Sequence, residues 1–181
     1  MYFHDSYLTG LSFQSNEWEY GDMSVQTEDV TDLAVEAWHE DGRWTLAPLP
    51  DAHDLEHIVD SLQKQQTNGG ALSLIAIGDD FFMIIRVLGT HVKGFISDVT
   101  FALDYQVAQD FVDYFDLEQP EEEDDPFPAG DLELLGDLGL HHMEIATLCD
   151  DADLFPDEQL EAIANRLGFG DDYLELVETE S

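Results

Sequence analysis

Residues 71–98 have the sequence ALSLIAIGDDFFMIIRVLGTHVKGFISD, in which turns separate three short apolar segments. The first segment ends at Gly78-Asp79-Asp80, the second ends at Gly89-Thr90, and the third extends from Val92 to Ile96. Short segments rich in β-branched and aromatic residues and bounded by Gly, Asp or Thr are typical of strands. A parallel return needs a crossover of about a dozen residues or more, so these short connections predict three antiparallel strands.

The residues before this meander predict two further strands and a helix. Apolar and more polar positions alternate over residues 32–38, as in a strand with two different faces. Asp41-Gly42 supplies the positive φ angles of a tight hairpin turn, and residues 44–48 form the return strand. Asp54 then begins a helix, which stops at Asn68-Gly69-Gly70.

A second helical segment follows the meander. Ser97 or Asp98 suits its N-cap, and apolar residues recur at helical spacing up to Phe115, in one long helix or two abutting ones. The order strand, strand, helix, three strands, helix predicts an α+β fold, with an antiparallel five-stranded sheet and helices on one side. We assign residues 31–116 to this sheet domain. Residues 1–30 show no sustained period and are predicted to be a poorly ordered extension.

An acidic linker and a helical unit are predicted after the sheet domain. Seven of the ten residues in DLEQPEEEDD (116–125) are acidic, and self-repulsion without apolar residues favours an extended, solvated chain. We place this Pro-bearing linker at 117–129. Residues 130–177 then predict three short helices, at 132–138, 143–149 and 156–167. A core of this size is marginal alone, so we expect the unit to dock on the sheet domain or on a partner.

The net charge narrows the classes of partner. The 181 residues include 42 acidic and 5 basic ones, which gives a formal charge of −37. Such a chain repels nucleic acid and anionic membranes, and it favours basic proteins or cations as partners. The alternative is that the acidity only keeps the protein soluble.

The number of cysteines and the lack of targeting and membrane-spanning patterns predict the redox state and the location of the protein. Cys149 is the only cysteine, so no internal disulfide or thiolate zinc cluster is expected. The first residues, MYFHDSYLTG, show no basic n-region and no apolar h-region of a secretory signal, and no apolar segment has the length of a membrane span. These features predict a cytoplasmic protein.

Three patterns resemble metal sites. His53-Asp54-Leu55-Glu56-His57 matches the H-x-x-E-H pattern of a group of zinc proteases, but acidic residues also favour the first turn of any helix. His142 and Cys149 supply two ligands where zinc needs at least three. Asp150-Asp151-Ala152-Asp153 lacks the glycine of a calcium loop. We therefore predict no metal, no cofactor and no catalytic residue, and a zinc-dependent hydrolase on His53–His57 is the enzymatic alternative.

The meander and the closing segment together resemble a known family. FFMIIRV…GFISD, the acidic linker and GDLELLGDLGL…LCDDADLFPDEQLEAIANRLGFGDDYLEL are similar to the actinobacterial tRNA adenosine deaminase-associated proteins over residues 32–177. The resemblance implies an accessory protein with no catalytic residues to carry over. A zinc deaminase needs H-x-E and P-C-x-x-C, which a chain with one cysteine cannot supply, so this chain is not the deaminase itself.

These observations predict a non-catalytic binding protein for a tRNA adenosine deaminase or another basic protein. A structural or regulatory domain unrelated to tRNA modification is the remaining alternative. Two sets of residues are candidates for the contact. The acidic set is Glu121, Glu122, Glu123, Asp124 and Asp125, and the apolar set is Leu154, Phe155, Leu167 and Phe169.

Overall fold

An antiparallel sheet of six strands forms the centre of the molecule. The computed structural model describes residues 31–65 and 67–180, so the extension predicted at residues 1–30 lies outside the described residues. The strand order is β2-β1-β3-β4-β5-β6. The strands are β1 (Thr31–Glu40), β2 (Arg43–Pro48), β3 (Ala71–Ile77), β4 (Phe81–Leu88), β5 (His91–Ile96) and β6 (Ala129–Gly130).

The predicted meander and hairpin are confirmed. β3, β4 and β5 are consecutive antiparallel neighbours, with Ile75 opposite Met83 and Ile84 opposite Phe95. Asp41 and Gly42 both have positive φ angles (50° and 80°) in the turn between β1 and β2, as a tight hairpin turn requires.

The prediction of five strands is wrong, because β6 adds a sixth strand at the edge beside β5. This strand has only two residues, and Gly130 lies opposite Phe95. Gly130 has a φ of 97°, and a Cβ at this position would collide with the Gly94 carbonyl oxygen. The strand thus forms through a close backbone approach that only glycine permits, and no hydrophobic pattern predicts it.

The helices form two separate layers, which pack in two different core clusters against the sheet. Within residues 31–65 and 67–180, no helix is long and apolar enough to span a bilayer. The helices are α1 (Leu55–Lys64), the 3₁₀ helix η1 (Val99–Leu103), α2 (Gln106–Tyr114), the 3₁₀ helix η2 (Gly136–Leu138), α3 (His142–Asp150), α4 (Pro156–Leu167) and α5 (Gly170–Glu180). Two abutting helices after the meander are therefore confirmed, as η1 and α2, with Asp98 as the N-cap of η1.

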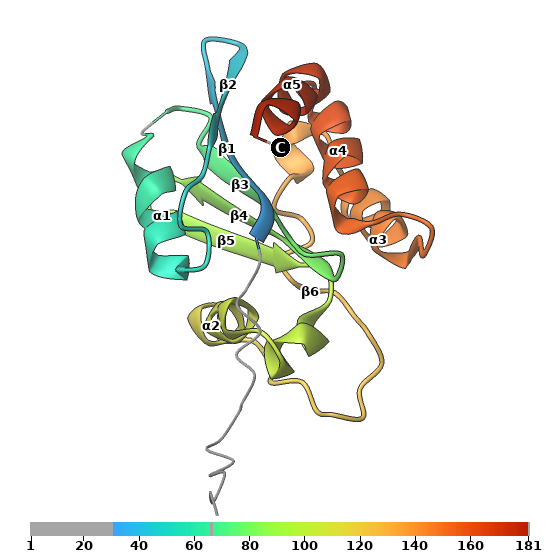
Figure 1. The fold of residues 1–181 in the computed structure, drawn as a ribbon. Helices are drawn as coiled ribbons and strands as arrows, with labels where there is room; N and C mark the ends of the chain where they lie inside the picture. The colour runs from blue at the N-terminus through green and yellow to red at the C-terminus, as the bar shows by residue number, and fades with distance from the viewer. Residues whose placement is uncertain (1–30, 66, 181) are drawn as a thin grey trace, which may run out of the picture.

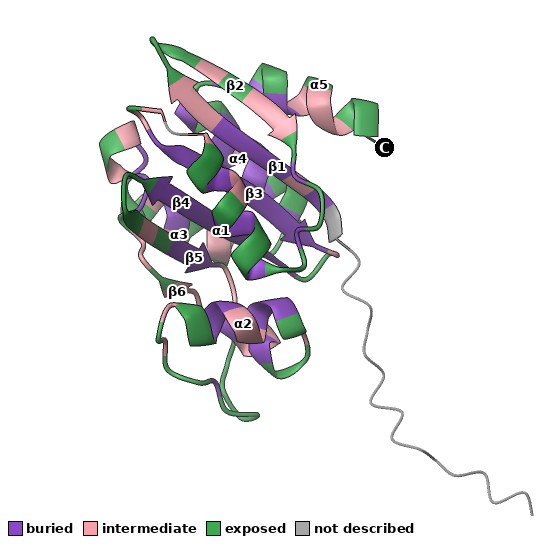
Figure 2. Cartoon of the chain, turned by 90° about the vertical axis from the view of Figure 1, so that its left-hand side faces the viewer, coloured by how far each residue is buried: buried purple, intermediate pink, exposed green. Residues whose placement is uncertain are grey.

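Helices cover both faces of the sheet, and not one face as the sequence predicted. Figure 1 shows α1 and α2 on one side of the sheet and α3, α4 and α5 on the other. In β4, Phe81, Met83 and Ile85 pack toward α1 and α2, whereas Phe82 and Ile84 pack toward the C-terminal helices. β3 and β4 are buried along nearly their whole length as a result (Figure 2).

The C-terminal helices differ from the three that were predicted. Residues 132–138 form turns and η2 in place of a helix, and the last helix, α5, was not predicted. α5 is held by Tyr173, which is buried, and by the preceding Phe169, whose ring centroid lies 4.7 Å from that of Trp44 in β2. The helical segment thus docks on the sheet, the first of the two expected arrangements.

Arg86 in β4 binds the C-terminal segment, residues 130–180, to the sheet. Its side chain is 5% exposed and points to the face of the sheet covered by that segment. The guanidinium donates to the carbonyl oxygen of Leu134 (2.7 Å), to the carbonyl oxygen of Gly69 (3.3 Å) and to both carboxylate oxygens of Asp137. A charged side chain buried to this extent must keep these partners, because water cannot replace them.

Replacing Gly94 by alanine is expected to destabilise the protein. A Cβ at Gly94 would overlap the Phe115 ring and would lie 2.8 Å from the Phe111 ring, which is fully buried. Overpacking of this kind costs about 1–3 kcal/mol. Urea unfolding should show that loss, and the additional change Phe115→Leu should recover part of it. Unchanged stability of Gly94→Ala would contradict the packing between β5 and α2.

Candidate functional site

The few basic residues are mostly engaged within the molecule. All five lie within the described residues, and three of them form ion pairs. Arg86 pairs with Asp137 and Lys93 with Asp131 (2.9 Å), which joins β4 and β5 to the C-terminal segment, and Arg166 pairs with Glu144 between α4 and α3. The other two, Arg43 and Lys64, lie at the start of β2 and the end of α1. The charge offered to a partner is therefore almost entirely negative.

The predicted acidic contact residues form one exposed loop. Glu121, Glu122, Glu123, Asp124 and Asp125 are all exposed. The loop turns on itself, because the Asp124 carboxylate accepts from the Glu121 backbone N–H (2.8 Å). It is tied at both ends: Pro120 is buried, and the Val99 N–H donates to the Phe127 carbonyl oxygen (2.9 Å) just before β6. Figure 1 shows the segment running outside the helical layers between α2 and β6.

The predicted apolar contact residues separate into two groups. Phe155 is 55% exposed and Leu154 is half-buried, so both are accessible at the turn before α4. Leu167 and Phe169 are 8% and 2% exposed and belong to the core under the C-terminal helices. A partner could reach these two only if α4 and α5 repacked, so we regard Leu167 and Phe169 as core residues.

Met143 is an exposed apolar residue that sequence reasoning did not select. Its side chain is 70% exposed on α3, a helix in which only Ile145 is fully buried. A signal was present, since the apolar residues Met143, Ile145, Ala146, Leu148 and Cys149 do not fall on one face of a 3.6-residue helix. Such a helix cannot bury all of them against a single layer.

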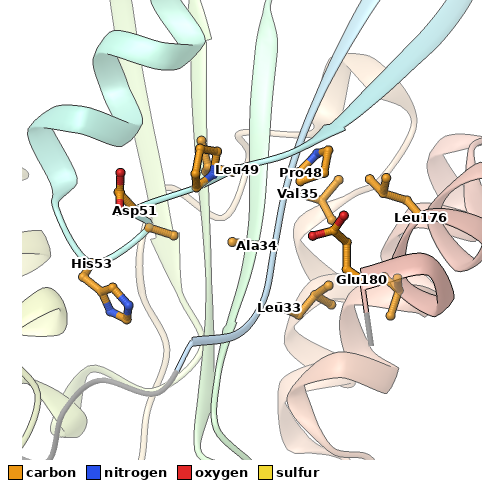
Figure 3. A pocket seen from close by; sticks show the side chains of 12 residues that line it. Leu33, Ala34, Val35, Pro48, Leu49, Asp51, His53, Leu176 and Glu180 are labelled. Atoms are coloured by element: carbon orange, nitrogen blue, oxygen red, sulfur yellow. The ribbon is translucent and has the colours of Figure 1, made fainter.

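A hollow of about 360 Å³ opens where β1 begins. It is lined by β1, by the loop before α1 and by the end of α5. Figure 3 shows Asp51 and His53 on one side of Ala34, and Leu176 and Glu180 on the other. The lining combines carboxylates with aliphatic residues and brings no nucleophile beside a base.

The His53–His57 motif does not assemble as a zinc-protease site. Asp54 is the N-cap of α1, and its carboxylate accepts from the His57 N–H (3.1 Å), so His53 precedes the helix. The two imidazoles therefore do not share a helical face. Across residues 31–65 and 67–180, no group of three or more His, Cys, Asp or Glu side chains is arranged to hold a metal.

The second potential zinc site, His141 and His142 with Cys149, does not form either, because these residues cap a helix, form an ion pair or are half-buried. His141 precedes α3 as its N-cap, and His142 Nδ1 lies 2.5 Å from the Glu133 carboxylate. Burial, with further contributions from Asp150 and Asp98, raises the pKa of the Cys149 thiol to about 12. The thiol is therefore protonated at neutral pH and is neither a nucleophile nor a ready zinc ligand. In the segment Asp150–Asp153, which was compared with a calcium loop, the Asp151 carboxylate accepts a hydrogen bond from the Asp153 N–H (3.1 Å) in a turn.

The fold and the composition together define an acidic α+β protein. The chain belongs to the family described as Rv3753c-like tRNA adenosine deaminase-associated protein, whose model matches residues 32–170. This confirms the resemblance in the meander and the closing segment.

One curated relative supports the same family. The chain is 37% identical to protein Rv3753c of Mycobacterium tuberculosis (strain ATCC 25618 / H37Rv) over 155 residues, which cover 82% of this chain and 90% of the relative. No solved structure matches the chain.

Proposed function

We propose that this chain is a non-catalytic accessory protein of the cytoplasm that binds a tRNA adenosine deaminase. The observation that carries the proposal is membership of a family described as tRNA adenosine deaminase-associated. Two properties of the chain support it: the net charge of −37, and the internal pairing of three of its five cations. A deaminase that acts on tRNA needs a basic face for the phosphates, and an acidic protein is complementary to such a face.

Inosine at the tRNA wobble position tests the functional link. We expect deletion of the gene to change the inosine fraction, and reintroduction of the wild-type chain to restore it. The direction of the change would show whether the deaminase is activated or inhibited. An unchanged inosine fraction in the deletion strain would contradict the proposal and would favour a structural or regulatory role unrelated to tRNA modification.

A further inference from the structure

A groove of about 590 Å³ separates α3 from α4 on the outer side of the C-terminal layer. The two helices lie next to each other in Figure 1. The ion pair between Arg166 and Glu144 lies in the groove. The apolar part of the lining consists of Leu140, Met143, Leu148 and Ala162.

Within the described residues, Met143 is the part of the apolar lining that stays open, whereas Leu140 is fully buried and Leu148 is half-buried against the core below the groove. Met143 is 70% exposed, and it is the most exposed of the large apolar side chains there. Exposed apolar surface at a concave site is typical of an interaction site. The flexible methionine side chain adapts to the shape of a bound apolar residue.

The charge around the groove is uneven. α3 and α4 run in opposite directions, since Arg166 near the end of α4 pairs with Glu144 near the start of α3, and Gln159 near the start of α4 donates to the Leu148 carbonyl oxygen (2.6 Å). Arg166, the cation at one end, is neutralised by its partner. Beyond the other end, outside the residues that line the groove, Asp150, Asp151 and Glu158 are exposed, and no Lys or Arg occurs between Gly94 and Asn165.

We propose that this groove binds a basic amphipathic helix of the partner protein. An apolar ridge on that helix would lie between α3 and α4, and its Lys or Arg residues would face the acidic end. The inference rests on the proposed function, to which it adds the site on this chain and the chemistry of the bound segment.

The charge disfavours two other occupants. Residues 1–30 of the same chain contain no Lys or Arg and six carboxylates, so they would be repelled from the acidic end. A second copy of the chain would bring a further charge of −37. Both remain distinguishable outcomes of the experiment.

A synthetic peptide tests the chemistry of the site directly. The probe is a Leu/Lys peptide with helical spacing, about 14 residues long so that the helix spans α4. We expect Met143→Glu to weaken binding of this peptide about 10-fold or more, because a carboxylate replaces the apolar wall. Attraction to the acidic surface alone predicts the opposite sign, since the variant gains a negative charge.

Leu103→Glu is the matched control. Leu103 is 47% exposed on η1, on the other side of the sheet, and the change removes the same kind of side chain and adds the same charge. We expect Leu103→Glu to bind the peptide as the wild type does. Circular dichroism should show both variants folded, since both side chains are exposed. Equal binding by wild type and Met143→Glu would overturn the proposal.

The same variants are then tested against the deaminase of the source organism. Loss of binding in Met143→Glu, but not in Leu103→Glu, is the expected result. If both variants bind as the wild type does, the groove proposal fails and the proposed function stands. If the wild type does not bind, the proposed function fails, and the peptide result still decides the groove.

A wild-type dimer that dissociates in Met143→Glu would assign the groove to a second copy and overturn the proposal. Tighter peptide binding after deletion of residues 1–30 would assign it to that segment, with the same consequence.

Discussion

Asp137→Ala is expected to reduce the free energy of unfolding by about 3 kcal/mol. Removing one partner of a buried ion pair costs about 3–5 kcal/mol, and we expect the lower end because the Asp137 side chain is 60% exposed. The change leaves the Arg86 guanidinium, 5% exposed, with only backbone carbonyl partners. The midpoint of urea unfolding at neutral pH measures the loss.

Asp131→Ala is the control for this prediction. Asp131 also pairs with a strand cation, but Lys93 is 52% exposed, and exposed pairs contribute about 1 kcal/mol or less. The two variants remove carboxylates of the same segment and differ in the burial of the cation. Equal losses in the two variants would contradict the account of Arg86 as the anchor of the C-terminal segment.

The same ion pair makes stability depend on acid pH. The hydrogen bond from Arg86 is the main cause that holds the pKa of Asp137 below its ordinary value of 3.8. A carboxyl group with a lowered folded pKa stabilises the folded state above its unfolded pKa, and this contribution is lost as the pH falls through the folded value. The wild type should therefore lose more stability than Asp137→Ala between neutral pH and the acid range below 3.8. An equal loss would contradict this assignment.

Neutralising the acidic loop is expected to slow association with the deaminase by about 10-fold or more. The variant replaces Glu121, Glu122, Glu123, Asp124 and Asp125 by their amides. Complementary charge raises association rates by about 10- to 1,000-fold, and salt screens it beyond about 8–10 Å at physiological ionic strength. Surface plasmon resonance at several salt concentrations measures the rates, and excess tRNA should displace the chain from the basic face.

A control variant separates local from overall charge. It neutralises five exposed carboxylates elsewhere: Glu40, Glu56, Asp60, Asp104 and Glu178. We expect a smaller effect than that of the loop variant. Binding that survives neutralisation of the loop and shows no dependence on salt would contradict the electrostatic account and leave the contact to apolar residues such as Phe155 and Met143.

The sequence predicts the elements of the sheet better than their surroundings. Turn residues with required φ angles, such as Asp41 and Gly42, fix the hairpin locally, and apolar segments between turns locate β3, β4 and β5. The burial of β4 on both faces of the sheet could also be predicted from the sequence, because Phe81 to Ile85 is apolar at every position rather than at alternate ones. A continuous apolar segment is typical of a strand buried on both sides.

Elements that depend on distant contacts escape prediction from the sequence. β6 exists because Gly130 approaches the backbone of Gly94, and α5 is held by contacts of Phe169 and Tyr173 with the rest of the core. For the candidate site, the exposed acidic loop follows from composition alone. Helical spacing shows that the apolar residues of α3 cannot all be buried on one face, but the packing of α3 and α4 decides that Met143 is the exposed one. The burial of Phe169, which lies between α4 and α5, depends on a distant contact with Trp44.

Direct association with the deaminase tests the central claim. Sedimentation velocity of the purified chain mixed with the purified deaminase of the source organism, at about 0.15 M salt, reports a complex without immobilising either protein. We predict a faster-sedimenting species that contains both proteins and diminishes as the salt concentration rises. Two folded proteins that sediment independently at every salt concentration would contradict the claim that this chain binds the deaminase.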